Sequence, residues 1–251
     1  MAHVWEKSYP PGIRWDMTFE PTSLNEFFDR AVSRWSSHVS LDFMDKKYTY
    51  AEVADLVHRM AEGLQKLGVG PGVQVGLFLP NCPQYVISFF AVHKAGGRVV
   101  NLSPLDAERE LRHKIEDAEI DFVVTLALNA LYPNIAKLLG STRLKKVIVS
   151  GLEEALPFPK NLLFPLAKRK DIAKWPRDDR HVAFKDLLKN PGKPKVHQVN
   201  DPVEEVALLQ YTGGTTGVPK AAMLTHANLT CALQMFDAWT KGGDHPLLEE
   251  G

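Results

Sequence analysis

The sequence predicts an α/β protein built on a parallel sheet that helices cover on both faces. Between residues 73 and 150, short apolar runs alternate with longer amphipathic runs in the order β-α-β-α-β-α-β. Because these runs are short and uniformly apolar, they resemble strands buried on both faces, which occur in parallel sheets with right-handed crossovers. With 251 residues and 45% hydrophobic content, the chain can bury one large or two modest domains.

Two capping boxes predict helices in the first third of the chain. Ser23 precedes Glu26 by three residues, and Thr49 precedes Glu52 by the same spacing. The second helix presents apolar residues at helical spacing and ends at Gly68.

The alternating region then predicts a regular series of elements. We expect strands at 75–79, 99–102, 122–126 and 147–149, and helices at 84–95, 106–117 and 128–139. We assign residues 1–150 to one α/β subdomain, 151–202 to a basic, proline-rich insertion or linker, and 203–251 to two further strands with a following helix.

The segment from 156 to 200 differs in composition from the rest of the chain. It holds six prolines, and residues 160–195 carry eleven Lys or Arg against four Asp, an excess of seven positive charges. We expect such a segment to form little regular structure.

Two interpretations of this basic segment compete. It is either a solvated connector or a surface on which Leu162, Leu163, Phe164 and the following basic residues rest against an anionic membrane. We favour the connector because Pro165 interrupts any amphipathic helix. Nucleic-acid binding is the weakest interpretation, since the aromatic residues form no regular stacking series and the net charge of the whole chain is zero.

A loop rich in glycine and threonine lies between two apolar runs, 206–210 and 220–224, that fit strands. Its candidate ligand-binding residues are Tyr211, Thr212, Gly213, Gly214, Thr215, Thr216, Gly217 and Lys220. The glycines permit positive φ angles and expose the backbone, so that successive N–H groups can form a concave nest. Hydroxyl groups and one ammonium add hydrogen bonds, which suits a polyphosphate anion.

This loop is not the Walker phosphate loop. Three residues separate Gly213 from Gly217, and Val218 and Pro219 precede Lys220, whereas the Walker pattern needs four residues between its glycines and ends in Gly-Lys-Ser/Thr. A flexible hairpin connection is the ordinary interpretation of a glycine-rich loop. The ordered run Thr-Gly-Gly-Thr-Thr-Gly-Val-Pro-Lys argues against it.

At these residues the sequence resembles the AMP-forming adenylate ligases, which include acyl-CoA synthetases, peptide-synthetase adenylation domains and luciferases. The run from Tyr211 to Lys220 fits their signature, and Met223 to Leu229 fits its continuation; Ala221 departs from the usual glycine. Gly214, where many members have serine, is typical of bacterial long-chain fatty-acid ligases. The resemblance therefore implies the amino-terminal part of the large domain of such a ligase.

The resemblance implies a two-step reaction. A fatty acid attacks the α-phosphate of ATP to give acyl-AMP and pyrophosphate, and coenzyme A then takes the acyl group. The loop would hold the β- and γ-phosphates together with Mg²⁺, with Lys220 as an electrostatic clamp.

The resemblance also places the catalytic residues elsewhere. The family's adenine, ribose and hinge motifs follow the segment matched here, so we expect the catalytic residues downstream of Gly251. Within these residues we expect no catalytic residue and no metal ligand. We therefore expect a piece that is inactive alone.

The remaining features concern location and competing functions. Cys82 and Cys231 are the only cysteines and Met1 to Lys7 has no apolar core segment, which favours a reducing cytoplasm. The alternative is a peripheral location on the inner face of the membrane, with contact through residues 160–195. The competing functions are a non-catalytic nucleotide-binding or interaction remnant, and an adenylating enzyme for aryl or amino acids.

Overall fold

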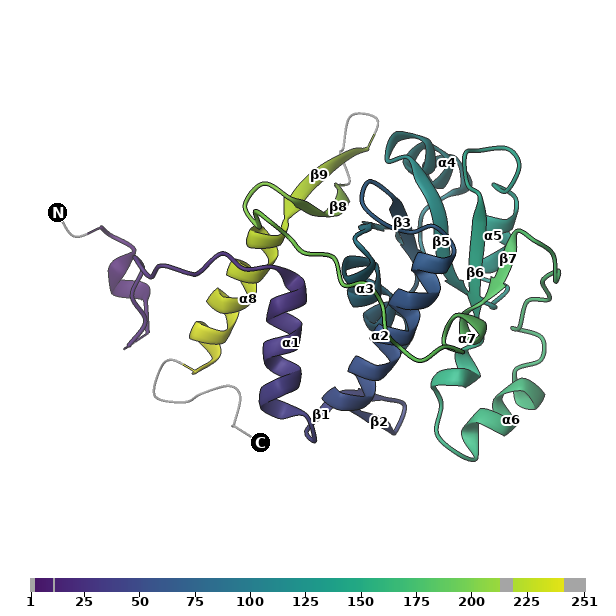
Figure 1. Ribbon diagram of the computed structural model, residues 1–251, viewed down its shortest axis with the longest axis horizontal. Coiled ribbons are helices and arrows are strands. Elements are labelled where there is room, and N and C mark those ends of the chain that lie inside the picture. Colours follow the sequence, from purple (N-terminus) through teal and green to yellow (C-terminus); the bar gives the residue numbers. More distant parts are fainter. Residues whose placement is uncertain (1–2, 11, 213–218, 242–251) are drawn as a thin grey trace.

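A seven-stranded sheet forms the centre of the protein in a computed structural model that describes residues 3–10, 12–212 and 219–241 (Figure 1). Its strand order is β7 (His181–Ala183), β6 (Lys146–Ser150), β5 (Ile120–Leu126), β3 (Gln74–Phe78), β4 (Arg98–Asn101), β8 (Val206–Thr212) and β9 (Lys220–Thr225). Neighbours from β7 to β8 are parallel, and β9 is antiparallel to β8.

Helices cover both faces of this sheet, as predicted. The helices are α1 (Leu24–Trp35), α2 (Tyr50–Lys66), α3 (Pro83–Ala95), α4 (Glu108–Asp117), α5 (Tyr132–Ala136), α6 (Lys160–Ala167), α7 (Phe184–Leu187) and α8 (His226–Lys241). The chain passes from β3 through α3 to β4 in one direction, and back through α4 and α5 to β5 and β6. Right-handed crossovers therefore place α3 on one face and α4 and α5 on the other. Helix α2 packs on α3, and α7 packs on α2.

Local sequence signals set the ends of the longer helices. The Ser23 hydroxyl accepts a hydrogen bond from the Glu26 N–H at 3.1 Å, and the Thr49 hydroxyl accepts one from the Glu52 N–H at 3.2 Å. Both glutamates accept from the backbone N–H of their capping residue, which completes the two predicted capping boxes.

The core lies between the sheet and its helices. All seven residues of β5 are buried, as expected for a strand with a helix layer on each face. The largest fully buried apolar side chains are Phe78, Leu24, Met60, Leu64, Leu77, Leu111, Ile115, Ile120, Leu126, Ile135 and Leu138. Lys94 is buried as well, and its ammonium contacts Asp29 Oδ1 at 2.8 Å.

Two predictions of secondary structure are wrong. The expected helix at 128–139 is limited to α5, because Pro133 suits only the first turn of a helix and the chain before it pairs Leu128 with Ile172 in an isolated bridge. The basic segment contains α6, β7 and α7, and β7 pairs with β6 at the edge of the sheet. A small antiparallel pair, β1 (Val39–Phe43) and β2 (Lys46–Thr49), was not predicted.

The division at 150 and 202 remains a prediction. Strands from all three predicted segments lie in the one sheet, since β6, β7 and β8 belong to successive segments. Two short 3₁₀ helices, η1 (Glu6–Ser8) and η2 (Leu152–Ala155), complete the elements described. Among the described residues, none of the helices has the length and apolar character needed to span a bilayer.

Candidate functional site

The β8–β9 hairpin carries the predicted phosphate loop. Thr212 ends β8 and Lys220 begins β9, and the two residues face each other in the antiparallel register. The Thr212 hydroxyl donates a hydrogen bond to the Lys220 carbonyl at 3.4 Å. Of the predicted ligand-binding residues, Gly213, Gly214, Thr215, Thr216 and Gly217 lie outside the described residues.

At the loop ends of β8 and β9, a cation and a hydroxyl are exposed to solvent. Thr212 and Lys220 are both exposed. Lys220 has no carboxylate within ion-pair distance among the described residues. An exposed ammonium in such a setting is suited to bind an external anion.

Tyr211 anchors the hairpin to α4. Its side chain is buried, and its hydroxyl donates a hydrogen bond to Asp117 Oδ2. Burial, together with this hydrogen bond and the charge of Asp117, raises the pKa of Tyr211 well above its ordinary value, so the phenol stays protonated. The Lys114 ammonium lies 5.3 Å from the centre of the Tyr211 ring. The hydroxyl is thus committed to α4, and ligand contact by this residue remains a prediction.

Helix α4 also contacts the hairpin on the β9 side, at Pro219. His113 Nε2 lies 3.1 Å from the carbonyl oxygen of Pro219, the residue before β9. The side chains of His113 and Asp117 are one helical turn apart, so a single face of α4 holds both sides of the hairpin. This bracing fixes the position of the hairpin base relative to the sheet.

A polar cavity of about 230 Å³ opens at the carboxyl ends of β3, β4 and β8. It is lined by Leu77, Leu79, Asn81, Tyr85, Asn101, Leu102, Ser103, Lys114, Gln210 and Tyr211. The order in which strands are added across the sheet reverses here, because β3 leads through α3 to β4 on one side whereas β4 leads through α4 to β5 on the other. Open α/β sheets bind their ligands at such switch points.

A chain of hydrogen bonds orders the polar side of this cavity. The Tyr85 hydroxyl donates to Asn101 Oδ1 at 3.0 Å, and Asn101 Nδ2 donates to Gln210 Oε1 at 2.8 Å. Burial raises the pKa of Tyr85, which keeps its hydroxyl a donor at neutral pH. Lys114 donates to Asp106 Oδ2 at 2.7 Å. Sequence analysis missed these residues, although Asn101 and Gln210 are polar residues at the ends of apolar strands.

A second cavity of about 450 Å³ lies between α4 and the hairpin, and Tyr211 lines it as well. Its walls are formed by His113, Asp117, Ala118, Leu209, Tyr211, Pro219, Lys220, Ala221 and Met223. Tyr211 therefore lines both cavities, at the end of β8.

A buried histidine pair lies where α8 follows β9. His226, the first residue of α8, accepts a hydrogen bond at Nδ1 from the Leu24 backbone N–H at 3.2 Å, which ties α8 to α1. Its ring lies 5.4 Å from that of His93 on α3. Burial lowers the pKa of both histidines, and that of His93 falls to about 3, with the charge of His226 as the smaller cause.

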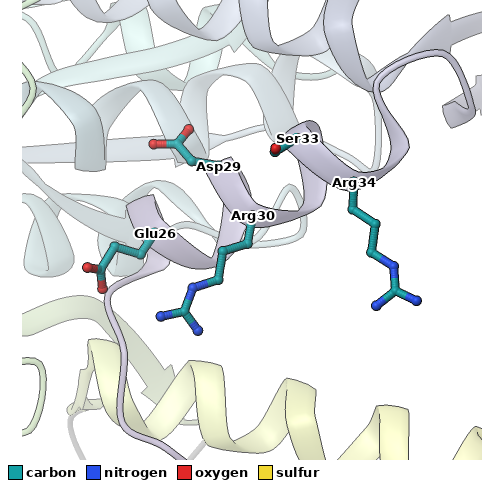
Figure 2. A pocket seen from close by; sticks show the side chains of 5 residues that line it. All are labelled: Glu26, Asp29, Arg30, Ser33 and Arg34. Carbon is teal, nitrogen blue, oxygen red and sulfur yellow. The ribbon is translucent and has the colours of Figure 1, made fainter.

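A hollow of about 470 Å³ along α1 does not form a comparable site (Figure 2). Glu26, Asp29, Arg30, Ser33 and Arg34 line it, and all five belong to this one helix. Figure 2 shows Arg30 and Arg34 extending toward α8, whereas Asp29 points the other way. Glu26 is held in the capping box and Asp29 by the buried Lys94. These carboxylates therefore serve the fold.

Comparison with known proteins identifies the family. The chain belongs to the AMP-binding enzymes, whose family model matches residues 28–247. It is 33% identical to a long-chain-fatty-acid–CoA ligase of Bacillus subtilis (strain 168) over 94% of this chain and 42% of that protein. It is 31% identical to one of Escherichia coli O6:H1 over 100% of this chain and 44% of that protein.

The chain thus spans less than half the length of these relatives. Gly251, beyond which we expect the catalytic residues, lies outside the described residues. The position of the catalytic residues therefore stays a prediction, as does the expectation that this piece is inactive alone.

Solved structures agree on the fold. A long-chain-fatty-acid–CoA ligase from Archaeoglobus fulgidus superposes with a TM-score of 0.68 at 25% identity, over 90% of this chain and 41% of that one. The anthranilate CoA ligase AuaEII in complex with anthranoyl-AMP superposes with a TM-score of 0.71 at 20% identity, over 87% and 38%. The predicted resemblance to adenylate-forming ligases is confirmed.

Proposed function

We propose that the protein forms part of an ATP-dependent fatty acyl-CoA ligase. In its first step a fatty-acid carboxylate attacks the α-phosphate of ATP and releases pyrophosphate; in the second, the thiol of coenzyme A displaces AMP from the acyl-adenylate. Membership of the AMP-binding family and the names of the relatives at 31–33% identity support this reaction class. The observation that carries the proposal is the exposed Lys220 ammonium beside Thr212 at the mouth of the hairpin.

The proposed site holds the tail of ATP. The Lys220 ammonium lies against the β- and γ-phosphates and offsets the charge that grows on departing pyrophosphate. When ATP binds, the Thr212 hydroxyl turns from the Lys220 carbonyl, 3.4 Å away, and donates its hydrogen bond to the same phosphates. We assign the remaining donors to the loop 213–217, with backbone N–H groups and the hydroxyls of Thr215 and Thr216. Lys220 acts here as an electrostatic clamp, because neither proton transfer nor covalent chemistry is required of it.

The polar cavity at the carboxyl ends of β3, β4 and β8 supplies a second part of the proposed site. Its volume of about 230 Å³ is smaller than the roughly 300 Å³ or more of a pocket that encloses a whole ligand. We therefore assign it to one polar portion of a substrate, recognised by Asn101 and Gln210. The fixed orientation of these two amides, which hydrogen-bond to each other, supports this assignment.

Mg²⁺ would accompany bound ATP as a counter-ion of its phosphates. Within the parts of the chain that the structure describes, no group of three or more His, Cys, Asp or Glu side chains could hold a metal ion. The expectation of no metal ligand stays a prediction, and we assign no step to the ion. We place the protein in the cytoplasm, a proposal supported by its free cysteines: Cys82 is buried and Cys231 half-buried.

Substitution of Lys220 tests the phosphate site. In the complete ligase polypeptide, Lys220→Ala should lower kcat/KM for fatty-acid-dependent ATP–pyrophosphate exchange on the order of 100-fold, because an electrostatic contact to the transition state is lost. Lys189→Ala is the matched control: this lysine is exposed, and it pairs with Asp186 on α7. An exchange rate of Lys220→Ala equal to that of Lys189→Ala would contradict the proposal.

The acid substrate needs a separate test. The same exchange assay with fatty, aromatic and amino acids should give the highest kcat/KM for a long-chain fatty acid, in line with the names of the relatives. A preference for an aromatic acid would support the adenylating reaction but replace the fatty acid as the proposed substrate. Exchange with none of these acids would favour the non-catalytic nucleotide-binding module.

A further inference from the structure

An exposed apolar cluster lies on and beside α6, in the basic segment. Its members are Phe158, Leu162, Leu163 and Leu166, which are 78%, 61%, 54% and 77% exposed. We call these four residues the α6 surface. Large apolar side chains exposed singly are common on proteins, but four within nine residues form a patch that indicates an interaction site.

The helix beneath this patch forms despite Pro165, contrary to the expectation from sequence. The N–H groups of Leu162 and Leu163 donate to the Pro159 carbonyl at 3.0 and 3.1 Å, and the Lys168 N–H donates to the Phe164 carbonyl at 2.8 Å. Pro165 removes one backbone hydrogen bond from a helix of eight residues, and the remaining bonds hold it. None of the eight residues is buried, so burial in the core does not account for these leucines.

Positive charge surrounds the α6 surface. Lys160 precedes the leucines, and Lys168, Arg169, Lys170 and Lys174 follow them, all exposed. Lys160 pairs with Asp45, and Lys168 lies 3.8 Å from Asp171. Arg169, Lys170 and Lys174 have no acidic partner within ion-pair distance in the described part of the chain. The exposed leucines therefore lie beside a cationic rim in which Arg169, Lys170 and Lys174 lack an ion-pair partner among the described residues.

The position of α6 leaves the surface accessible. Helix α6 projects from the lower right edge of the molecule in Figure 1, and its main neighbour is η2. The β8–β9 hairpin lies at the top of the same view, so the two regions are separated. A change on α6 should consequently leave the hairpin unaltered.

We propose that the α6 surface docks the protein on an anionic lipid bilayer, with the leucines inserted at the headgroup boundary and the basic rim against lipid phosphates. Interfacial helices combine these two features, and each Lys or Arg near an anionic surface strengthens binding roughly fivefold. Nucleic acid fits the charge but not the leucines, because single strands are held by stacked aromatic rings. The proposal is independent of the ligase reaction, although a bilayer surface is where a fatty acid would partition.

Vesicle co-sedimentation tests the proposal. The protein is mixed with vesicles of phosphatidylcholine alone or of phosphatidylcholine with about 30% phosphatidylglycerol. We expect binding to the anionic vesicles at least about tenfold tighter than to the neutral ones, and weakened by salt. Equal binding to both vesicle types, or no binding to either, would overturn the proposal.

Two pairs of variants separate the apolar from the charged contribution. Leu166→Asp should weaken binding at least about tenfold, whereas Leu105→Asp, at a leucine that is 93% exposed but outside the patch, should leave it unchanged. Reversing charge at Lys168, Arg169 and Lys170 to Glu should abolish anionic selectivity. The same reversal at Lys189, Lys193 and Lys195 changes the net charge by the same amount. It should leave most of the selectivity for anionic vesicles.

Other occupants of the surface give distinct results. If Leu166→Asp abolishes a dimer seen by analytical ultracentrifugation and vesicle binding is absent, then the surface joins two copies of this chain and the lipid proposal fails. Binding to heparin or single-stranded DNA without vesicle binding would refute it in favour of a polyanion. Equal vesicle binding by Leu166→Asp and Leu105→Asp would show that the leucines take no part.

Discussion

The buried pair His93 and His226 predicts that the protein loses stability in mild acid. Neither ring nitrogen of His93 has a hydrogen-bond partner among the described residues, and the side chain is 2% exposed. Its ring contacts those of Phe89 and His226, with centres 4.8 and 5.4 Å away. Protonation would place a charge in this apolar setting, which is why burial lowers the pKa of His93 from 6.5 to about 3.

The sign and size of the effect follow from proton binding. Between pH 6.5 and about 3 the unfolded chain carries a proton on His93 that the folded protein does not, so the stability is complete above pH 6.5 and is lost as the pH falls. Each pH unit in this window costs about 1.4 kcal/mol, which gives roughly 2 kcal/mol between pH 7 and pH 5. His226, whose pKa is also lowered, contributes in the same direction.

The variant His93→Phe isolates the contribution of His93. Phenylalanine keeps an aromatic ring against Phe89 and His226 but cannot take up a proton. Urea unfolding at pH 7 and pH 5 should show that the free energy of unfolding falls by about 2 kcal/mol less in His93→Phe than in the wild type. Any offset between the two proteins at pH 7 reflects packing and does not enter this difference.

The control disturbs the same contact without removing the titrating group. Phe89→Leu alters the packing around His93, so its stability should differ from wild type by a similar amount at both pH values. If His93→Phe loses as much stability as the wild type between pH 7 and pH 5, then the reasoning about the buried imidazole is refuted.

Two further predictions concern the packing of the helices around the sheet. Gly63→Ala should lower the free energy of unfolding by about 2 kcal/mol in a urea titration, because an added Cβ would lie 2.4 Å from the Leu187 carbonyl oxygen, where α2 meets α7. Asp29→Asn should lower it by a similar amount, about 2 kcal/mol, because it leaves the buried Lys94 ammonium without its carboxylate, and this figure already allows for the 52% exposure of Asp29.

Matched substitutions distinguish these effects from ordinary surface changes. A Cβ at Gly70 would meet only the Ala95 carbonyl oxygen at 4.0 Å, so Gly70→Ala should be nearly neutral. Asp42 pairs at 3.9 Å with the exposed Lys47, so Asp42→Asn should cost little. Equal unfolding midpoints for Gly63→Ala and Gly70→Ala would contradict the packing argument, and equal midpoints for the two Asp variants would contradict the role of the buried pair.

Much of the fold could be predicted because its signals are local. A capping box joins groups three residues apart, so Ser23 with Glu26 and Thr49 with Glu52 could be recognised without knowledge of the fold. The apolar runs that became β3, β4, β5 and β6 are rich in hydrophobic residues, which is typical of strands buried on both faces of a sheet. The loop from Thr212 to Lys220 is likewise contiguous, and so its pattern could be recognised as a candidate phosphate-binding site.

Tertiary packing decided what local patterns could not. His181–Ala183 is too short to be recognised as a strand, and it is ordered by pairing with β6 and by the burial of Phe184 and Leu187 beside it. The polar edge of the cavity depends on Asn101 and Gln210, which lie 109 residues apart and meet only because β4 pairs with β8. His93 and His226 meet in the same way, through α3 and α8. Short-range hydrogen bonds follow from neighbours in sequence, whereas a site shared by several strands exists only once burial of the sheet has brought them together.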